Sequence, residues 1–163
     1  TQGVSSAASD VYKRQGMPLT VRQLLDRKSS GVYSIRPDAS VLEALELMAR
    51  EDISSVLVTE GEELKGIFTE RDYARKVILR GRNSRDTVVR ELMTSQLITI
   101  TPQNNIADCM SIMTERHIRH LPVMDGGKVV GLVSIGDVVK SIISDQEATI
   151  QQLAGYIAGD LKT

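Results

Sequence analysis

The sequence is poor in several residue types that particular functions need. Its 163 residues include one cysteine and no tryptophan, and 3% of them are aromatic. The single Cys109 cannot form an internal disulfide, which is consistent with a reducing compartment. The shortage of aromatic side chains argues against stacking platforms for single-stranded nucleic acid. The chain also has no apolar run near the roughly 18 residues that a membrane span needs.

The sequence has no large excess of charge of either sign. The formal net charge is −1 at pH 7, which argues against nucleic acid or an anionic membrane as the main partner. Hydrophobic residues make up 41% of the chain, which is enough to bury a core. These features indicate a folded protein that uses neither a membrane nor nucleic acid.

A short motif occurs twice, 65 residues apart. Residues 66–72 read Gly-Ile-Phe-Thr-Glu-Arg-Asp, and residues 131–137 read Gly-Leu-Val-Ser-Ile-Gly-Asp. Each copy ends an apolar run and opens a stretch with helical spacing, which places its hydroxyl and its acid at a helix start. These residues fit an ordinary helix cap. The same position also favours phosphate, and an aspartate there can accept hydrogen bonds from ribose hydroxyls.

The duplication extends well beyond the motif. Residues 32–78 align with residues 97–143 without a gap, and their caps, turns and apolar faces coincide. Each repeat is predicted to be a β-α-β-β-α unit of the α/β (α+β) class. Because a repeat of under 50 residues is too small for a good core of its own, we expect the two to pack sheet on sheet as one pseudo-twofold globule.

The second repeat is predicted to contain three strands and two helices. Asn105 and Asp108 indicate a capped helix in the middle of the repeat. A second helix is expected from about Gly136 to Ile143. The three strands are expected at Leu97–Ile100, His120–Met124 and Val129–Val133.

Four segments are expected along the chain. Residues 1–16 carry no periodic pattern, so we expect a disordered leader or a remnant of cloning or upstream translation, followed by a natural start at Met17. Residues 17–82 hold a leading helix and the first repeat, and residues 83–144 hold a linker turn and the second repeat. Residues 145–163 are predicted to form a C-terminal amphipathic helix whose apolar face needs a partner. That face consists of Ile150, Leu153, Ala154 and Ile157.

Two repeats that each end in Gly-apolar-apolar-Thr/Ser-x-x-Asp resemble a pair of CBS domains. The stretches from Thr69 to Tyr73 and from His117 to Val123 resemble stand-alone bacterial and organellar members of that family. The resemblance covers about residues 18–144. It implies a disc with flanking helices and two clefts that bind adenosyl compounds, and it implies a homodimer that regulates a partner protein. The implied location is cytoplasmic, with an organellar matrix as the alternative.

The resemblance assigns candidate nucleotide-binding residues in both motifs. Asp72 and Asp137 match the ribose-binding acids of the family. Thr69 and Ser134 match hydroxyls near the ribose or the phosphate. Arg71 is either a solvated helix residue or a contact to the phosphates of a dinucleotide such as NAD.

Two further candidates lie at the start of a strand in the second repeat. Arg119 and His120 match phosphate-side positions of the family, whereas their counterparts in the first repeat are Ser54 and Ser55. This difference predicts that the two clefts bind unequally and that a phosphate-rich ligand depends on Arg119. His117 and His120 also have a spacing used by metal ligands, but no cysteine or acid completes a set, so no metal is expected.

The expected function is therefore regulatory ligand sensing. The resemblance implies binding of AMP, ADP or ATP, possible binding of NAD in the second cleft, and signalling to an unidentified protein. A dimeric scaffold without a physiological nucleotide and a sensor of S-adenosylmethionine remain alternatives. Enzymatic activity is not expected, because the sequence shows no nucleophile, base and orienting group together and no Walker loop or GxGxxG.

Overall fold

The computed structural model describes residues 19–28 and 31–162, with the side chains of 148–153 and 155–162 left outside the description. The predicted leader, residues 1–16, lies outside the described residues. Backbone contacts divide the chain into two compact units, which we call the sheet unit and the helical unit. Over the described residues, the sheet unit contains 28, 31–102 and 120–132, and the helical unit contains 19–27, 103–119 and 133–162.

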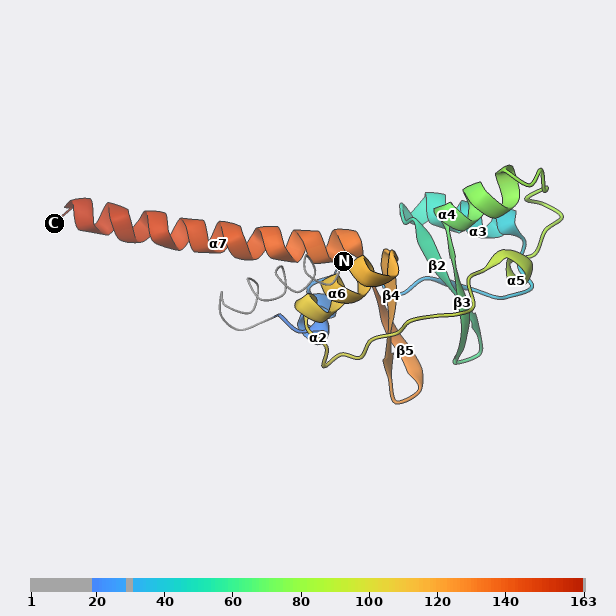
Figure 1. Ribbon diagram of the computed structural model, residues 1–163, viewed down its shortest axis with the longest axis horizontal. Coiled ribbons are helices and arrows are strands. Elements are labelled where there is room, and N and C mark those ends of the chain that lie inside the picture. Colours follow the sequence, from blue (N-terminus) through green and yellow to red (C-terminus); the bar gives the residue numbers. More distant parts are fainter. Residues whose placement is uncertain (1–18, 29–30, 163) are drawn as a thin grey trace. The chain divides into compact units, whose positions relative to one another are not determined.

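The first repeat lies entirely in the sheet unit and has the predicted β-α-β-β-α order. Strand β1 pairs parallel with β2, and β2 pairs antiparallel with β3 through a turn at Gly61, whose φ is 62°. Figure 1 shows α3 and α4 beside this sheet. The elements are β1 (Ser34–Ile35), α3 (Val41–Glu51), β2 (Ser55–Glu60), β3 (Glu63–Thr69), α4 (Glu70–Asp72) and the π-helix η1 (Tyr73–Ile78).

The first repeat builds its core together with the linker that follows it. Helix α5 (Val89–Leu92) begins where the Val89 N–H donates to the Ala39 carbonyl at 2.8 Å. Its apolar residues complete a cluster that excludes water from the sheet, which is the main favourable term in folding. The buried members of the cluster are Val41, Ala44, Met48, Val56, Val58, Phe68, Val77, Val89 and Leu92.

The second repeat contains the predicted hairpin but lacks a full first strand. The expected strand Leu97–Ile100 is reduced to an isolated parallel bridge between Ile100 and Val123, which corrects the prediction. In the first repeat, the Leu57 N–H donates to the Tyr33 carbonyl at 3.1 Å. The residue that matches Leu57 is Pro122, which has no N–H to donate, so the parallel ladder cannot extend. The hairpin consists of β4 (His120–Asp125) and β5 (Lys128–Ser134).

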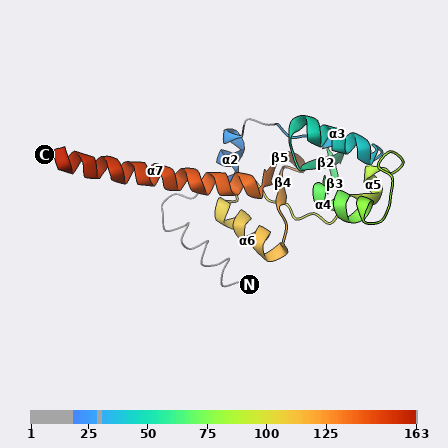
Figure 2. The ribbon, with the colours of Figure 1, turned by 90° about the horizontal axis from the view of Figure 1, so that it is seen from above.

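The helical unit contains α2 (Val21–Arg27), α6 (Ile106–Arg116) and α7 (Ile135–Lys162). The Ile106 N–H donates to the Leu19 carbonyl at 3.0 Å, and the Val21 N–H donates to the Asn104 carbonyl at 2.7 Å. Figure 2 shows α2 and α6 on either side of the start of α7. The leading helix of the chain therefore packs with helices of the second repeat.

Helix α7 is longer than either helix that the sequence predicts for this region. It runs without interruption through residues for which separate helices were expected, from Gly136 to Ile143 and again from Asp145 (Figure 1). Ser144, the single residue between the two expected helices, is neither glycine nor proline, so it does not break the helix. Ala154 is exposed, and the other predicted members of the tail's apolar face lie outside the described side chains.

The backbone reproduces the internal duplication in detail. Asp52 ends α3 with φ of 54°, and its counterpart His117 ends α6 with φ of 55°. The residue after each cap donates its N–H to a matching carbonyl, from Ile53 to Met48 at 3.0 Å and from Ile118 to Met113 at 3.2 Å. A left-handed residue at a helix C-terminus is uncommon outside glycine and asparagine, so its recurrence supports the duplication read from the sequence.

Candidate functional site

The first motif lies where β3 passes into α4. Thr69 is the N-cap of α4, and its Oγ1 accepts a hydrogen bond from the Asp72 N–H at 3.1 Å. In return, Asp72 Oδ2 accepts from the Thr69 N–H at 3.0 Å and from Thr69 Oγ1 at 3.1 Å. This reciprocal pair is a capping box, so the predicted place of both residues at a helix start is confirmed.

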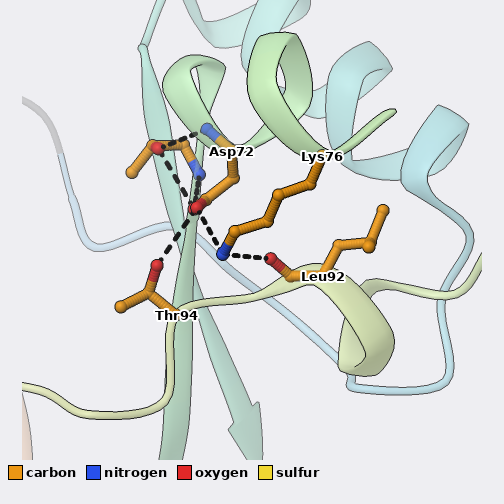
Figure 3. Close-up of polar contacts among 5 residues, drawn as sticks. Asp72, Lys76, Leu92 and Thr94 are labelled. Carbon is orange, nitrogen blue, oxygen red and sulfur yellow. Dashed lines mark hydrogen bonds and ion pairs between the residues drawn. The ribbon is translucent and has the colours of Figure 1, made fainter. Parts of the chain in front are cut away.

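The other carboxylate oxygen of Asp72 binds one donor from η1 and one from the segment after α5 (Figure 3). Asp72 Oδ1 accepts from Thr94 Oγ1 at 3.1 Å and forms an ion pair with Lys76 Nζ at 2.9 Å. Lys76 Nζ also donates to the Leu92 carbonyl at 3.0 Å. We call Thr69, Asp72, Lys76, Thr94 and the Leu92 carbonyl the Asp72 cluster.

The Asp72 cluster fixes the first motif to the linker. Asp72 is 6% exposed, and a buried carboxylate is tolerated only when it is paired and hydrogen-bonded. Leu92 is the last residue of α5, so its carbonyl has no partner within that helix and Lys76 supplies one. The cluster therefore provides hydrogen-bond partners both for the buried Asp72 carboxylate and for the last carbonyl of α5.

Two side chains of this cluster, and the Leu92 carbonyl, were missed by the sequence reasoning. Lys76 follows Asp72 at the i,i+4 spacing of helical ion pairs, and that spacing was the available signal. Thr94 is separated from Asp72 by 22 positions, and no local pattern in the sequence reveals that contact.

The second motif lies where β5 passes into α7. The Ser134 N–H donates to Asp137 Oδ2 at 2.8 Å, and Ser134 Oγ accepts from the Asp137 N–H at 3.2 Å. Both residues are half-buried. The carboxylate is therefore held in the first turn of a 28-residue helix, where the helix dipole favours negative charge.

Each motif is tied to the residue that precedes the matching strand of its repeat. The Glu70 N–H donates to the Ser54 carbonyl at 3.0 Å, and the Ile135 N–H donates to the Arg119 carbonyl at 2.9 Å. Ser54 and Arg119 therefore occupy equivalent positions beside the two helix starts. The predicted correspondence between them is confirmed at the level of the backbone.

Arg119 and His120 differ in their surroundings: the Arg119 carbonyl is bonded to the second motif, whereas the His120 side chain contacts Ser54. His120 is half-buried, and its Nε2 lies 3.3 Å from Ser54 Oγ, in a hydrogen bond whose direction depends on the histidine tautomer. Arg119 is exposed. The candidates thus fall into two groups, Ser54, Thr69, Asp72 and His120 in the sheet unit and Arg119, Ser134 and Asp137 in the helical unit.

The remaining candidate residues differ in their exposure. Arg71 is exposed on α4, next to Asp72, whereas Ser55 at the start of β2 is 4% exposed. Ser55 therefore presents little surface to any ligand, and Ser54 is the exposed member of that pair.

Cys109 does not have the properties of a reactive or metal-binding cysteine. Burial in α6, assisted by the negative charge of Asp108, raises the pKa of its thiol to about 12. A thiol with this pKa stays protonated at neutral pH, and the thiolate is the form that attacks electrophiles and binds metals.

No group of three His, Cys, Asp or Glu side chains gathers around a possible metal position in the described part of the chain. None of the described helices combines the length and the apolar character needed to cross a membrane.

The chain matches a family model and several curated proteins. The family model of the CBS domain matches residues 21–78 and residues 89–144. The mitochondrial CBS domain-containing protein CBSX3 of Arabidopsis thaliana is 39% identical over 161 residues, which span 95% of this chain and 73% of the relative. YhcV of Bacillus subtilis is 31% identical over 123 residues, which span 76% of this chain and 87% of the relative.

A solved structure supports the same assignment. A protein with CBS domains from Burkholderia ambifaria MC40-6 is 47% identical and superimposes with a TM-score of 0.75, over 78% of this chain and 96% of the other. The duplicated motif, the two structural repeats and these matches agree, and the chain belongs to the CBS-domain family with two CBS repeats.

Proposed function

We propose that this chain is a regulatory module that binds an adenine nucleotide, AMP, ADP or ATP, and transmits its occupancy to a partner protein. Proteins with a pair of CBS domains are generally regulatory and sense nucleotides. The Burkholderia relative is described as a signal-transduction protein, which agrees with a regulatory role here. The stand-alone relatives favour regulation over catalysis for this chain.

The observation that carries the proposal is the geometry of Ser134 and Asp137. Their reciprocal hydrogen bonds hold a half-buried carboxylate at the first turn of α7. A carboxylate offers about four acceptor positions, so it can receive the two hydroxyls of a ribose in addition to a backbone N–H. Arg119, whose carbonyl is bonded to the same helix start, provides a positive charge for the phosphates of that ligand.

The first motif offers a second, different set of groups. His120 and Ser54 lie together, and the Ser54 carbonyl accepts from the N–H at the start of α4. We assign Thr69, Asp72 and His120 to this second position, with Arg71 near its phosphates. NAD and S-adenosylmethionine are included as candidate ligands because each carries an adenosine with a ribose diol.

The location and the assembly form part of the same proposal. A cytoplasmic location is proposed, and the mitochondrial relative supports an organellar matrix as the alternative. The chain is proposed to act as a homodimer with an unidentified regulated protein as its target.

A thermal-shift panel tests the proposed function. The full chain is heated with AMP, ADP, ATP, NAD, S-adenosylmethionine and, as a negative control, GTP. A ligand present at about 100 times its Kd stabilises the fold by roughly 2.7 kcal/mol, which gives a clear rise in Tm. A scaffold without a physiological nucleotide shows no shift with any member of the panel.

Calorimetry with Asp137→Ala then locates the site. Loss of hydrogen bonds to a charged acceptor costs roughly 1.5–3 kcal/mol, about ten- to a hundredfold in affinity. Asp38→Ala removes an exposed carboxylate outside both motifs and serves as the matched control. Unchanged affinity in Asp137→Ala contradicts the assignment of this residue to ribose.

A further inference from the structure

The two motifs differ at the position four residues after their aspartates. Lys76 follows Asp72 at this spacing, whereas the matching residue after Asp137 is Ser141. The position three residues after each aspartate is basic and exposed in both repeats, with Arg75 in the first and Lys140 in the second. Of these two basic positions, only the one four residues after the aspartate differs in charge between the repeats.

The helices that follow the two aspartates also differ in their winding. After Asp72 the chain forms the π-helix Tyr73–Ile78, in which the Leu79 N–H donates to the Ala74 carbonyl at 3.1 Å. The equivalent residues after Asp137 continue the α-helix α7. π-Helical turns are rare and occur frequently at functional sites, and this one contains Lys76.

The lysine determines how accessible the carboxylate is. Asp72 is 6% exposed, and its Oδ1 receives both Lys76 Nζ and Thr94 Oγ1 while Oδ2 receives the two donors of Thr69. A ribose diol that binds this carboxylate has to replace donors already in place, and one of them carries a full charge. A charged lysine donor binds a buried carboxylate more strongly than a neutral ribose hydroxyl does. Replacing Lys76 by a ribose hydroxyl is therefore unfavourable.

We propose that Lys76 closes the first motif to ribose. This inference rests on the proposed function and names the residue that distinguishes its two positions. Lys76 acts through Asp72 and the linker carbonyl of Leu92, so it is a specificity-determining residue that does not itself contact ligand. A ligand that does enter the first motif releases Lys76 and Thr94, and with them the linker after α5.

Reciprocal substitutions test this assignment with adenosine, which carries no phosphate and so does not respond to the loss of positive charge. In the Asp137→Ala background, Lys76→Ser is expected to raise the affinity of the first motif for adenosine by at least about tenfold. Arg75→Ser removes the same charge one residue earlier, from an exposed side chain, and is expected to leave that affinity unchanged.

The opposite change is made in the second repeat. Ser141→Lys, in an otherwise unaltered chain, is expected to lower the affinity of the Asp137 motif by at least about tenfold. Ser141→Met introduces a side chain of comparable length without a charge, and it controls for crowding at this buried position. Equal loss in both variants overturns the charge argument, and so does unchanged affinity in Ser141→Lys.

Hydrogen exchange provides a readout that does not depend on any ligand. The Thr94 N–H donates to the Ile67 carbonyl at 2.8 Å, next to the Asp72 cluster. Lys76→Ser is expected to speed exchange of this amide by about tenfold, because the linker loses an anchor, and Arg75→Ser is expected to have no effect. If neither the parent chain nor any variant binds an adenosyl ligand, the proposed function fails. Unchanged exchange of the Thr94 amide in Lys76→Ser shows that Lys76 does not hold the linker, and it overturns the inference itself.

Discussion

Gly66 lies directly against Thr94. A Cβ atom added to Gly66 would lie 2.7 Å from the Thr94 carbonyl oxygen and 2.8 Å from Met93 Sδ. The adjacent residue, Ile67, exchanges two backbone hydrogen bonds with Thr94, at 2.9 Å and 2.8 Å. The glycine that opens the first motif is therefore required by the approach of the linker to β3.

Gly66→Ala is expected to destabilise the fold. The nearest atom belongs to the backbone, so the new methyl group can be accommodated only by moving the linker away from β3. Overpacking of this kind costs roughly 1–3 kcal/mol, which denaturant unfolding of the variant and the parent chain measures directly.

Gly31→Ala is the matched control for this substitution. Nothing lies within 4 Å of a Cβ atom added there, so the unfolding midpoint is expected to stay close to that of the parent chain. A similar loss of stability in both variants contradicts the steric explanation for Gly66.

Arg119→Ala is expected to weaken phosphate-rich ligands selectively. Arg119 is exposed, and its carbonyl is bonded to the helix start of the second motif, so we expect its guanidinium to bind the phosphates rather than the ribose. ATP and ADP should lose more affinity than adenosine, and the affinity of the parent chain for ATP should fall as salt is added. Two-site calorimetric titrations measure both effects.

Arg116→Ala, which removes an exposed arginine from the last turn of α6, controls for the general loss of positive charge. An equal loss of affinity for adenosine and ATP in Arg119→Ala, or an equal loss at both sites, is incompatible with the predicted role of Arg119.

Local signals in the sequence were sufficient to predict most of the secondary structure and the duplication. The caps at Thr69 and Asn105 are present with their reciprocal hydrogen bonds, and strands β4 and β5 lie within one residue of their predicted ends. These features depend on residues close together in the chain, and their period and capping residues are visible without any tertiary information.

The features that were missed depend on contacts between distant residues. Pro122 shortens the expected strand Leu97–Ile100 because it cannot donate a hydrogen bond to that strand. This effect depends on which residues pair, Ile100 with Val123, and the apolar composition of the strand does not show it. The bond between Asp72 and Thr94 likewise requires knowledge of where the linker lies. For the same reason, the two motifs share the pattern Gly-apolar-apolar-Thr/Ser-x-x-Asp but have different surroundings.

Cys109 is expected to resist alkylation in the folded chain at pH 8. Burial, together with the charge of Asp108, raises the pKa of its thiol from 9.0 to about 12, so the reactive thiolate is scarce. The raised pKa also means that its contribution to stability is fully present below pH 9 and is lost as the pH rises from about 9 through 12. Labelling with a thiol reagent at increasing denaturant should follow unfolding, and rapid labelling of the native protein contradicts this assignment.

The chain is expected to form a homodimer through the outer face of α7. Ile135, Val139 and Ile143 are 44%, 47% and 49% exposed and recur every four residues along the helix. An apolar stripe at this spacing lies on one face, and burying such a face against another helix is favourable because it removes apolar surface from water.

Light scattering should give twice the monomer mass at micromolar concentration. Val139→Asp should lower the dimer fraction. Lys140→Asp should change the dimer fraction little, because the Lys140 side chain is already polar and exposed. A monomer mass with and without nucleotide rules out the dimer, and a dimer that tolerates Val139→Asp places its interface elsewhere.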